Sequence, residues 1–360
     1  METKVRIKKK IVRIVLTLTA ILLLKGLFAW SNRCCDFYFH SWYIWSSLAF
    51  RQVTGIVPFS IGDVIYSAWI IGGIVYLLKL CYKLIRMAWA AIGLQLLRGL
   101  HFVLKAYLVF LILWGFNYER DSLESDTGLV TSTYNTQQLY QLSDTLLQLV
   151  NHDKAAIGDT MGVLLPDTAA VPVFKRAVAA YNIAEHTWPA LRYRGVSVKS
   201  SLFGKWLNYI GTTGYLNPFT NEAQVNTTVP PVMQPFVTCH EIAHQLGYAP
   251  EEDANFVGYL AATSIPDNRF RYAANFDMFM YSVRQLSRRD TTLAHYIWSR
   301  AVPGVKADYK AIIDFYEPYT GKADEYSAML YDRYLKANNQ HKGINSYSEV
   351  IGWLMAYYKL

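Results

Sequence analysis

The sequence has few charged residues. They make up 17% of the 360 residues, while hydrophobic residues make up 52%; about a quarter of an average soluble domain is charged. This composition predicts a membrane protein with a soluble part attached, organised in two or three units. The formal net charge of +8 comes without an RNA- or DNA-binding motif. Because the basic residues cluster at the N-terminus and around apolar runs, membrane topology explains them better, and we expect no nucleic-acid partner.

Cysteine is also scarce. Four cysteines, two of them adjacent at Cys34 and Cys35, are too few and too badly placed for a disulfide framework. Cys239 precedes the first histidine of a motif described below. It would point about a hundred degrees around the helix from that histidine, so we interpret it as a packing residue and not as a ligand. The chain has no internal repeat and no low-complexity tract.

Three apolar runs predict membrane-spanning helices at about residues 11–30, 61–81 and 101–116. The first run follows a basic start and lacks a small-residue cleavage site, so we expect a retained helix and not a removed signal peptide. Basic residues also gather between the second and third runs. This distribution predicts a cytoplasmic N-terminus, with residues 1–117 as the membrane region. Three crossings then place everything after Asn117 outside the cytoplasm.

Three features near the membrane leave alternatives open. Residues 31–59 are rich in Trp, Tyr and Phe, which indicates an interfacial stretch or a short loop. Residues 87–97 fit a re-entrant or surface helix, or an extension of the third run. Asp63, near the outer end of the second run, is either an interfacial helix cap or a functional intramembrane carboxylate. We favour the cap.

The chain becomes polar and then globular after the membrane region. Residues 118–134 predict an exit linker, and residues 135–360 predict an extracytoplasmic domain. Hydrophobic periodicity predicts mainly α-helical structure there. The expected helices are one through Leu139–Leu149 and others near 169–186, 276–283, 307–316, 323–337 and 347–358, the last opened by the capping-box pair Ser346 and Glu349.

A β-hairpin is expected before the central motif. Residues 214–216 and 223–226 flank a turn rich in Asn, Pro and Thr, which is typical of two paired strands. A strand edge in this position could add a substrate peptide as one more strand. The simpler alternative is a structural hairpin that contacts no substrate.

The strongest functional signal is His240-Glu241-Ile242-Ala243-His244. Histidines four residues apart share one face of a helix, so both imidazoles can reach a single metal ion. Glu241 lies beside them with a carboxylate that can accept a proton from water. This is the H-E-x-x-H pattern of zinc hydrolases. The simpler alternative is a helix whose histidines only cap or pack.

A catalytic zinc site needs a third protein ligand and an open position. Gly247 can end the first helix and turn the chain, and Pro250 suits the start of a second one. Glu251 would then lie in the first turn of that helix, and we predict it as the third ligand, with Glu252 as its nearest rival. Asn255, one turn further along, is a candidate to steady the ligand.

Peptide hydrolysis also needs a donor for the developing oxyanion besides the metal. Tyr215, Tyr248 and Tyr272 are candidates, and the sequence alone does not choose among them. Gln224 and Asn226 on the expected hairpin are further candidates for substrate contacts.

Several stretches together resemble a known bacterial family. They are Asn217-Pro218-Phe219-Thr220, Glu222-Ala223-Gln224-Val225-Asn226, His240 to Gln245, Glu251 with Ala254-Asn255-Phe256, and the tail Leu335-Lys336-Ala337-Asn338 with Gly343 to Tyr347. The chain resembles the domain-of-unknown-function 3810 family over nearly its whole length. The resemblance implies a protein of the bacterial inner membrane, with a few N-terminal membrane helices followed by a mainly helical, zincin-like metallopeptidase domain.

The same resemblance bears on the ligands. Other Glu-type zincins carry Glu-x-x-Ala-Asp, and by analogy Glu251-x-x-Ala254-Asn255 places the third ligand at Glu251. This chain has Asn255 where those proteins have Asp, so the analogy supports the role of Glu251 as a ligand more strongly than the supporting role of Asn255.

The sequence as a whole predicts a mainly α protein that hydrolyses peptide or amide bonds on the extracytoplasmic side, with Zn²⁺ as cofactor. The expected partners are a peptide or protein substrate and the lipid bilayer. One alternative is an intramembrane protease, which polar residues such as Gln234 and Gln245 around the motif oppose. A second is a non-catalytic, zinc-containing protein that binds peptides or envelope material. A transporter component has weak support.

Overall fold

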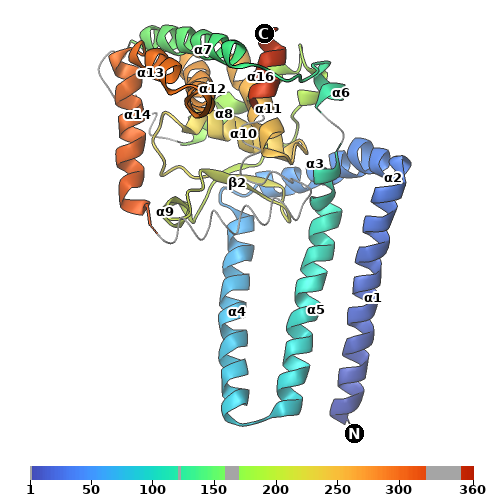
Figure 1. Cartoon of the computed structure of the whole chain (residues 1–360). Coiled ribbons are helices and arrows are strands. Elements are labelled where there is room, and N and C mark those ends of the chain that lie inside the picture. Colours follow the sequence, from blue (N-terminus) through green and yellow to red (C-terminus); the bar gives the residue numbers. More distant parts are fainter. Residues whose placement is uncertain (1, 121–122, 159–169, 322–349) are drawn as a thin grey trace.

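The protein is described here by a computed structural model that covers residues 2–120, 123–158, 170–321 and 350–360. Long helices form one end of the molecule, and a mainly helical globular domain lies over their upper ends (Figure 1). Short helices that run across the long ones separate the two parts. This arrangement confirms the predicted mainly α fold with N-terminal membrane-type helices and a small sheet.

Within the described residues, three helices are long and apolar enough to cross a membrane. They are α1 (Glu2–Trp30), α4 (Ile61–Ile85) and α5 (Trp89–Leu113). Much of their apolar surface is exposed, as expected of helices that contact lipid. The chain is therefore a membrane protein. Of the alternatives for residues 87–97, the structure shows the extension: α5 begins at Trp89, twelve residues before the predicted start.

Residues 32–55 form helices, and only residues 56–59 form a turn. They comprise α2 (Asn32–Phe37), a π-helical turn (Tyr38–Trp42) and α3 (Tyr43–Gly55), which lie across the ends of the long helices (Figure 1). Trp42 and Trp45 remain exposed there, and tryptophan favours the headgroup level of a bilayer. The interfacial interpretation is thus the one that fits.

The start of α4 is capped by Ser60, whose side chain accepts a hydrogen bond from the Asp63 backbone N–H at 2.8 Å. Asp63 lies in the first turn of the helix and is fully buried beneath the globular domain. Ser60 and not Asp63 is therefore the cap residue, so the interpretation that we favoured for Asp63 is wrong.

The globular domain contains most of the remaining helices. They are α6 (Glu124–Thr127), α7 (Thr136–Ile157), α8 (Ala170–Ala184), α9 (Gly204–Asn208), α10 (Gln234–Gln245), α11 (Glu251–Ser264), α12 (Asn268–Arg289), α13 (Thr291–Ser299), α14 (Pro303–Tyr316) and α16 (Val350–Tyr358). Short 3₁₀ turns are found at Gly115–Glu119, Pro189–Leu191 and Glu317–Tyr319. One large hydrophobic core joins α7, α8, α10, α11 and α12.

The predicted helices overlap α7, α8, α12, α14 and α16, although α12 is longer than predicted, and α6, α9 and α13 were not predicted. The leucine stripe from Leu139 is the buried face of α7, which begins with a capping box between Asn135 and Gln138. The helix expected at 323–337, and the capping pair Ser346 and Glu349, lie outside the described residues.

The sheet has three short strands in the order β1-β3-β2. β2 (Gly214–Asn217) and β3 (Glu222–Val225) form the predicted antiparallel hairpin, with Tyr215 opposite Gln224. β1 (Val198–Ser200) pairs with β3 in parallel and was not predicted, because three residues are too few for a visible alternating pattern. β2 is an edge strand of this sheet, and it contacts α10.

Candidate metal centre

Helix α10 presents the two histidines of the motif. It begins at Gln234, with Pro235 in its first turn, where a missing backbone donor costs nothing. It ends near Leu246, and Gly247 follows with φ +94°, a conformation that favours glycine. Cys239 is fully buried in the core, as its interpretation as a packing residue requires.

Helix α11 brings the acid to the same place. Pro250 precedes it in an extended conformation, and Glu251 is its first residue. Gly258 lets α11 approach α10 closely, because a Cβ at Gly258 would lie 3.0 Å from the backbone nitrogen of His240. The close crossing of the two helices therefore positions Glu251 over the histidines.

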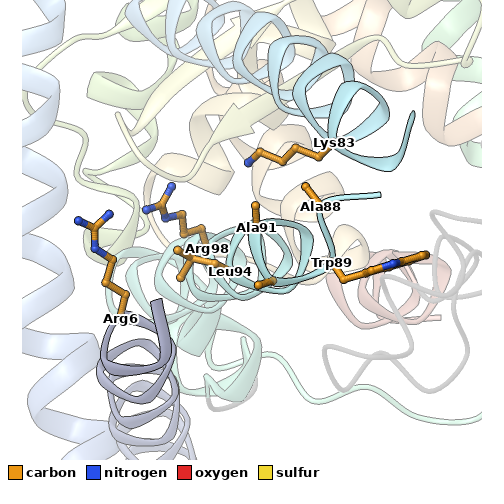
Figure 2. A pocket seen from close by; sticks show the side chains of 8 residues that line it. Arg6, Lys83, Ala88, Trp89, Ala91, Leu94 and Arg98 are labelled. Carbon is orange, nitrogen blue, oxygen red and sulfur yellow. The ribbon is translucent and has the colours of Figure 1, made fainter. Parts of the chain in front are cut away.

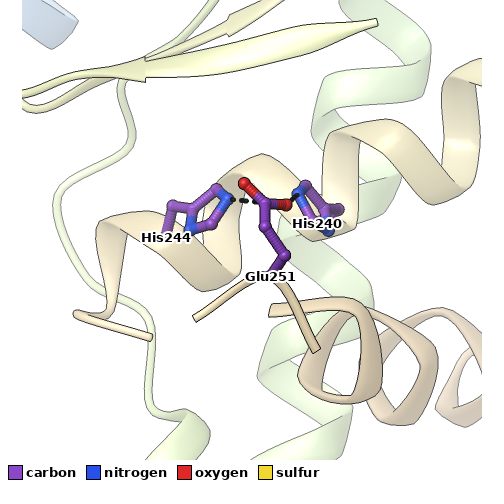
Figure 3. A group of neighbouring side chains, drawn as sticks. All are labelled: His240, His244 and Glu251. Atoms are coloured by element: carbon purple, nitrogen blue, oxygen red, sulfur yellow. Dashed lines mark ion pairs between the residues drawn. The ribbon is translucent and has the colours of Figure 1, made fainter. Parts of the chain in front are cut away.

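His240, His244 and Glu251 converge, with ligand atoms all within 4.8 Å of one another (Figure 3). The Nε2 atom of His240 lies 3.3 Å from Oε2 of Glu251, and the Nε2 atom of His244 lies 3.8 Å from the same oxygen. The two imidazole rings are nearly perpendicular, at 86°. Among the described residues, the predicted ligand Glu251 and not its rival Glu252 belongs to this cluster.

The orientation of His244 is fixed by its other ring nitrogen. Nδ1 lies 2.7 Å from the backbone carbonyl oxygen of Tyr248. Because a carbonyl can only accept, Nδ1 donates, and Nε2 keeps its lone pair toward the cluster. This is the arrangement that metal-binding histidines usually show, with the second nitrogen held by a carbonyl or carboxylate. The turn after Gly247 thus orients the imidazole of His244 directly.

The side chain of Glu241 extends from α10 toward the edge strand β2. A Cβ placed on Gly214 of β2 would meet Oε1 of Glu241 at 2.5 Å and its Cγ at 2.8 Å, so only a glycine there leaves the carboxylate its present position. The Oε2 atom of Glu241 is buried and has no hydrogen-bond partner among the described residues. A buried polar atom without a hydrogen-bond partner is rare in proteins. Where one occurs, it often belongs to a site that acts on a ligand.

The pKa values of the cluster are strongly perturbed. Burial is the main reason that the pKa of Glu241 rises to about 8; the charge of His240 lowers it and that of Glu251 raises it. Burial disfavours the charged form of His240, but its hydrogen bond with Glu251 and that residue's charge outweigh this and raise its pKa to about 9. Burial and the charge of His240 lower the pKa of His244 to about 4. Such opposed shifts are typical of functional sites.

The C-terminal end of α10 is held from the membrane side. The hydroxyl of Tyr43 in α3 donates to the carbonyl oxygens of His244 and Gln245, at 3.3 and 3.1 Å. Arg51, also in α3, donates to the Gln245 carbonyl at 3.2 Å, and Arg120 donates to the Leu246 carbonyl at 3.0 Å. These donors satisfy carbonyls that a helix end leaves free, and the two cations suit its negative pole.

The segment predicted as an exit linker, residues 118–134, is part of this support. Leu123 is 1% exposed and belongs to the main core. Arg120 forms an ion pair with Asp126 at 2.9 Å and lies over the ring of Tyr248, 4.5 Å from its centroid. The segment therefore packs against the turn that follows α10 and is more than a spacer.

The three tyrosines predicted as oxyanion donors are already engaged through their hydroxyls. Tyr248 donates to Asp126 at 2.9 Å, and Tyr272 donates to Asp308 at 2.6 Å. Tyr215 donates to Asp63 at the start of α4. The structure brings Tyr215 and Tyr248 close to the motif helix but points none of the three hydroxyls at the ligand cluster.

The predicted substrate-contact residues of the hairpin are fully buried. The Gln224 side chain donates to Glu222 at 3.4 Å, and Asn226 donates to Asn208 at 2.7 Å. β3 is the central strand of the sheet, so its side chains hold the hairpin together. These contacts favour a structural role for both residues.

Asn255 is buried one turn after Glu251, as expected of a residue that supports the ligand, and its Nδ2 has no hydrogen-bond partner among the described residues. Two neighbours on α12 were not predicted. Burial raises the pKa of Asp277 to about 7, although the charge of His240 lowers it. Burial, with the charges of Asp277 and Glu251, raises the pKa of Tyr281 well above its usual range, which keeps this phenol protonated. Tertiary packing brings both residues to the site, and no local pattern marks them.

The fold and this cluster define a membrane-anchored, mainly α-helical protein with two histidines and one glutamate arranged as metal ligands. The chain belongs to the family described as "Protein of unknown function (DUF3810)", whose pattern matches residues 38–355. No curated protein matches the chain. No solved structure matches it either.

Proposed function

We propose that the protein is a membrane-anchored zinc metallopeptidase, which hydrolyses peptide or amide bonds on the extracytoplasmic side of the bacterial inner membrane. The observation that carries this proposal is the convergence of two histidine Nε2 atoms and one glutamate oxygen within 4.8 Å. Two histidines and a carboxylate are a common ligand set of catalytic zinc, and a three-residue set leaves one tetrahedral position open.

The residues around the cluster fit a zinc ion. The tautomer of His244 leaves the lone pair of Nε2 available, because Nδ1 donates to the Tyr248 carbonyl. Glu251 supplies the negative charge that a divalent cation favours, and the cluster is largely shielded from water, with His240 13% exposed. A proton on Nε2 of His240 and a metal cation would compete for the same position, because Glu251 attracts both.

Glu241 is the group that handles the proton. A bound zinc ion supplies Lewis acidity that allows a water molecule to lose its proton near neutral pH. Glu241 accepts that proton as the water oxygen attacks the carbonyl carbon, and it then delivers the proton to the leaving nitrogen as the C–N bond breaks. Its buried, unpartnered Oε2 and its pKa of about 8 suit a group that is protonated and deprotonated in turn.

The orientation follows from the charges at the far end of the membrane helices. Arg6 lies near the start of α1, Lys83 near the end of α4 and Arg98 in the first half of α5. In Figure 1 these parts of the helices lie away from the globular domain. Basic residues favour the cytoplasmic side, which leaves the globular domain outside the cytoplasm. A reporter fused after Leu360 should behave as extracytoplasmic, and cytoplasmic behaviour would reverse this assignment.

The decisive test compares the full-length wild type with Glu241→Gln. Both proteins should bind one zinc ion, measured by mass spectrometry of the metal, because Glu241 is not a ligand. The variant should hydrolyse a pool of fluorogenic peptides at least about 100-fold more slowly, since a positioned base contributes about 10²–10⁴-fold. Equal rates would eliminate the mechanism.

The same pair of proteins separates the alternative, a zinc-containing protein that only binds peptides or envelope material. In that case both proteins would bind the peptides with equal affinity and neither would hydrolyse them. Absence of zinc from the wild type would remove both proposals.

A further inference from the structure

The candidate metal centre lies directly over the end of a membrane helix. Trp114 follows the last residue of α5, and its ring contacts the ring of His244 edge to face, with centroids 6.1 Å apart and planes at 86°. Trp114 is only 5% exposed and belongs to a small core with Tyr43, Leu111 and Ala249. A predicted metal ligand is thus in contact with the residue at which the membrane segment ends.

The sheet is fixed to a second membrane helix. The carboxylate of Glu222 in β3 accepts hydrogen bonds from the backbone N–H groups of Ile61 and Gly62, at 3.1 and 2.6 Å. These hydrogen bonds satisfy free backbone donors at the start of α4. Tyr215 of β2 donates to Asp63 in the same turn, and its ring stacks with that of Tyr66. The globular domain therefore has a fixed height above the membrane helices.

The edge strand lies on the membrane side of the motif helix. In Figure 1, β2 lies between α10 and the upper end of α4, and its Tyr215 donates to Asp63 at that end of α4. Gly214 of the same strand contacts Glu241, so the strand borders the position at which the proposed reaction would occur. A peptide added beside β2 would lie close to the membrane surface.

We infer that the substrate is an extended segment of a membrane-anchored polypeptide, close to the point where that polypeptide leaves the bilayer. This inference rests on the proposed peptidase function. A site held at the level of the interfacial helices is reached at once by a chain emerging from the same membrane. A soluble folded protein must first bring a flexible segment down to that surface.

Tethering also raises the concentration of the substrate at the site. A short flexible tether gives an effective concentration of about 1 mM, roughly 100-fold above a free peptide supplied at about 10 µM. The advantage falls as the tether lengthens beyond the distance that it must span. The dependence of rate on tether length therefore reports the height of the site above the membrane.

The test uses full-length protein in phospholipid vesicles with a pool of fluorogenic peptides. The peptides are supplied free, or attached to a lipid anchor through a short or a long flexible spacer. We expect the short-spacer form to be hydrolysed at least about 10-fold faster than the free form, and faster than the long-spacer form. Glu241→Gln, assayed by binding, should show the same preference for the short spacer.

The outcomes separate the two proposals. Faster hydrolysis with the long spacer, or equal rates for free and anchored peptides, would overturn the membrane-proximal substrate and leave the peptidase intact. Hydrolysis of none of the forms would overturn the peptidase, and this inference with it.

A separate observation concerns the opposite end of the membrane helices. A cavity of about 680 Å³ opens there between α1, α4 and α5 (Figure 2). Its lining residues are Arg6, Lys83, Ala88, Trp89, Ala90, Ala91, Leu94 and Arg98. The set contains three cations, each from a different helix, and no acidic residue among those that the structure describes.

The geometry points to a binding site for the phosphate of an acidic phospholipid in the leaflet away from the globular domain. Basic pockets between membrane helices on the cytoplasmic side are typical sites for such headgroups. Arg6 and Arg98 can bind phosphate through several N–H groups, and Lys83 adds a third charge while also donating to Gln95. Trp89 and Leu94 supply the apolar wall that a lipid needs and free phosphate does not.

The test measures how much phosphatidylglycerol remains on full-length protein after detergent exchange, by native mass spectrometry. Arg98→Gln, and Arg98→Gln with Lys83→Gln, should lose most of the lipid. The matched control, Lys79→Gln with Arg86→Gln, removes the same charge near the end of α4, outside the cavity lining, and should retain the lipid. Equal loss in both double variants, equal retention of phosphatidylcholine, or complete displacement by soluble glycerol phosphate would overturn the assignment to an acidic lipid.

Discussion

The position of Glu241 depends on the absence of a side chain at Gly214, which makes Gly214→Ala a sensitive test of the proposed mechanism. The added Cβ would lie 2.8 Å from Cγ of Glu241, and ordinary contact begins at 3.4 Å, so Cγ has to retreat by about 0.6 Å. The third close neighbour, the Gln224 carbonyl oxygen at 2.9 Å, belongs to the paired strand and cannot easily yield. The carboxylate is therefore the group that moves.

The expected consequence is a loss of rate without a loss of metal. A displacement approaching 1 Å in a catalytic group can cost about 100-fold, and we expect a fall in kcat of that order. His240, His244 and Glu251 do not contact Gly214 closely, so zinc content should remain that of the wild type. The assay is hydrolysis of the fluorogenic peptide pool by full-length protein, with zinc measured on the same samples.

Gly73→Ala is a suitable control, because a Cβ at Gly73 meets nothing within 4 Å and the helix should tolerate it. Two results would refute the reasoning. If Gly214→Ala keeps the wild-type kcat, Glu241 does not act from the position described here. If zinc is lost in proportion to activity, the glycine supports the ligands and not the base.

Three further predictions follow from the contacts around the site and the core. Chelation should lower the thermal stability of the wild type but not of His244→Ala, because zinc at 100 times its Kd adds about 2.7 kcal/mol, and equal shifts in both proteins would argue against this site. Tyr43→Phe removes the donor to two carbonyls of α10. It should lower the free energy of unfolding, measured with denaturant, by about 1–2 kcal/mol and weaken zinc binding. An unchanged unfolding free energy and an unchanged zinc affinity would show that this contact does not stabilise the site. Lys154 and Asp308 form a buried pair at 2.6 Å, so Lys154→Met should cost about 3–5 kcal/mol, and Lys154→Met with Asp308→Leu should recover much of it.

The convergence of His240, His244 and Glu251 could be predicted because its geometry is local. Two histidines four residues apart share a helix face in any α-helix, and a glycine followed by a proline marks the end of one helix and the start of the next. The distance from His244 to Glu251 is only seven residues, so few chain paths connect them. The membrane helices were predictable for a similar reason, since composition over about twenty residues decides them.

The surroundings of the ligands could not be predicted in this way. Gly214 reaches the site from β2, Asp277 from α12 and Trp114 from the residue that follows α5, and none of them lies in the motif helices. The choice among candidate tyrosines fails for the same reason: whether a hydroxyl is available depends on its partner. The hydroxyl of Tyr272 donates to Asp308 and that of Tyr248 donates to Asp126, and neither acid lies near its tyrosine in the sequence.

The boundary between membrane region and soluble domain is where the sequence gives the least guidance. Periodicity shows that a helix ends near Gln245, but not which groups satisfy its last carbonyls, and in this protein the donors come from Tyr43 and Arg51. A fragment that begins after α5 would lack both donors and would leave the Gln245 carbonyl without them. The candidate metal centre therefore depends on the full chain, because α3, which lies across the ends of the membrane helices, also holds the end of the helix that carries His240 and His244.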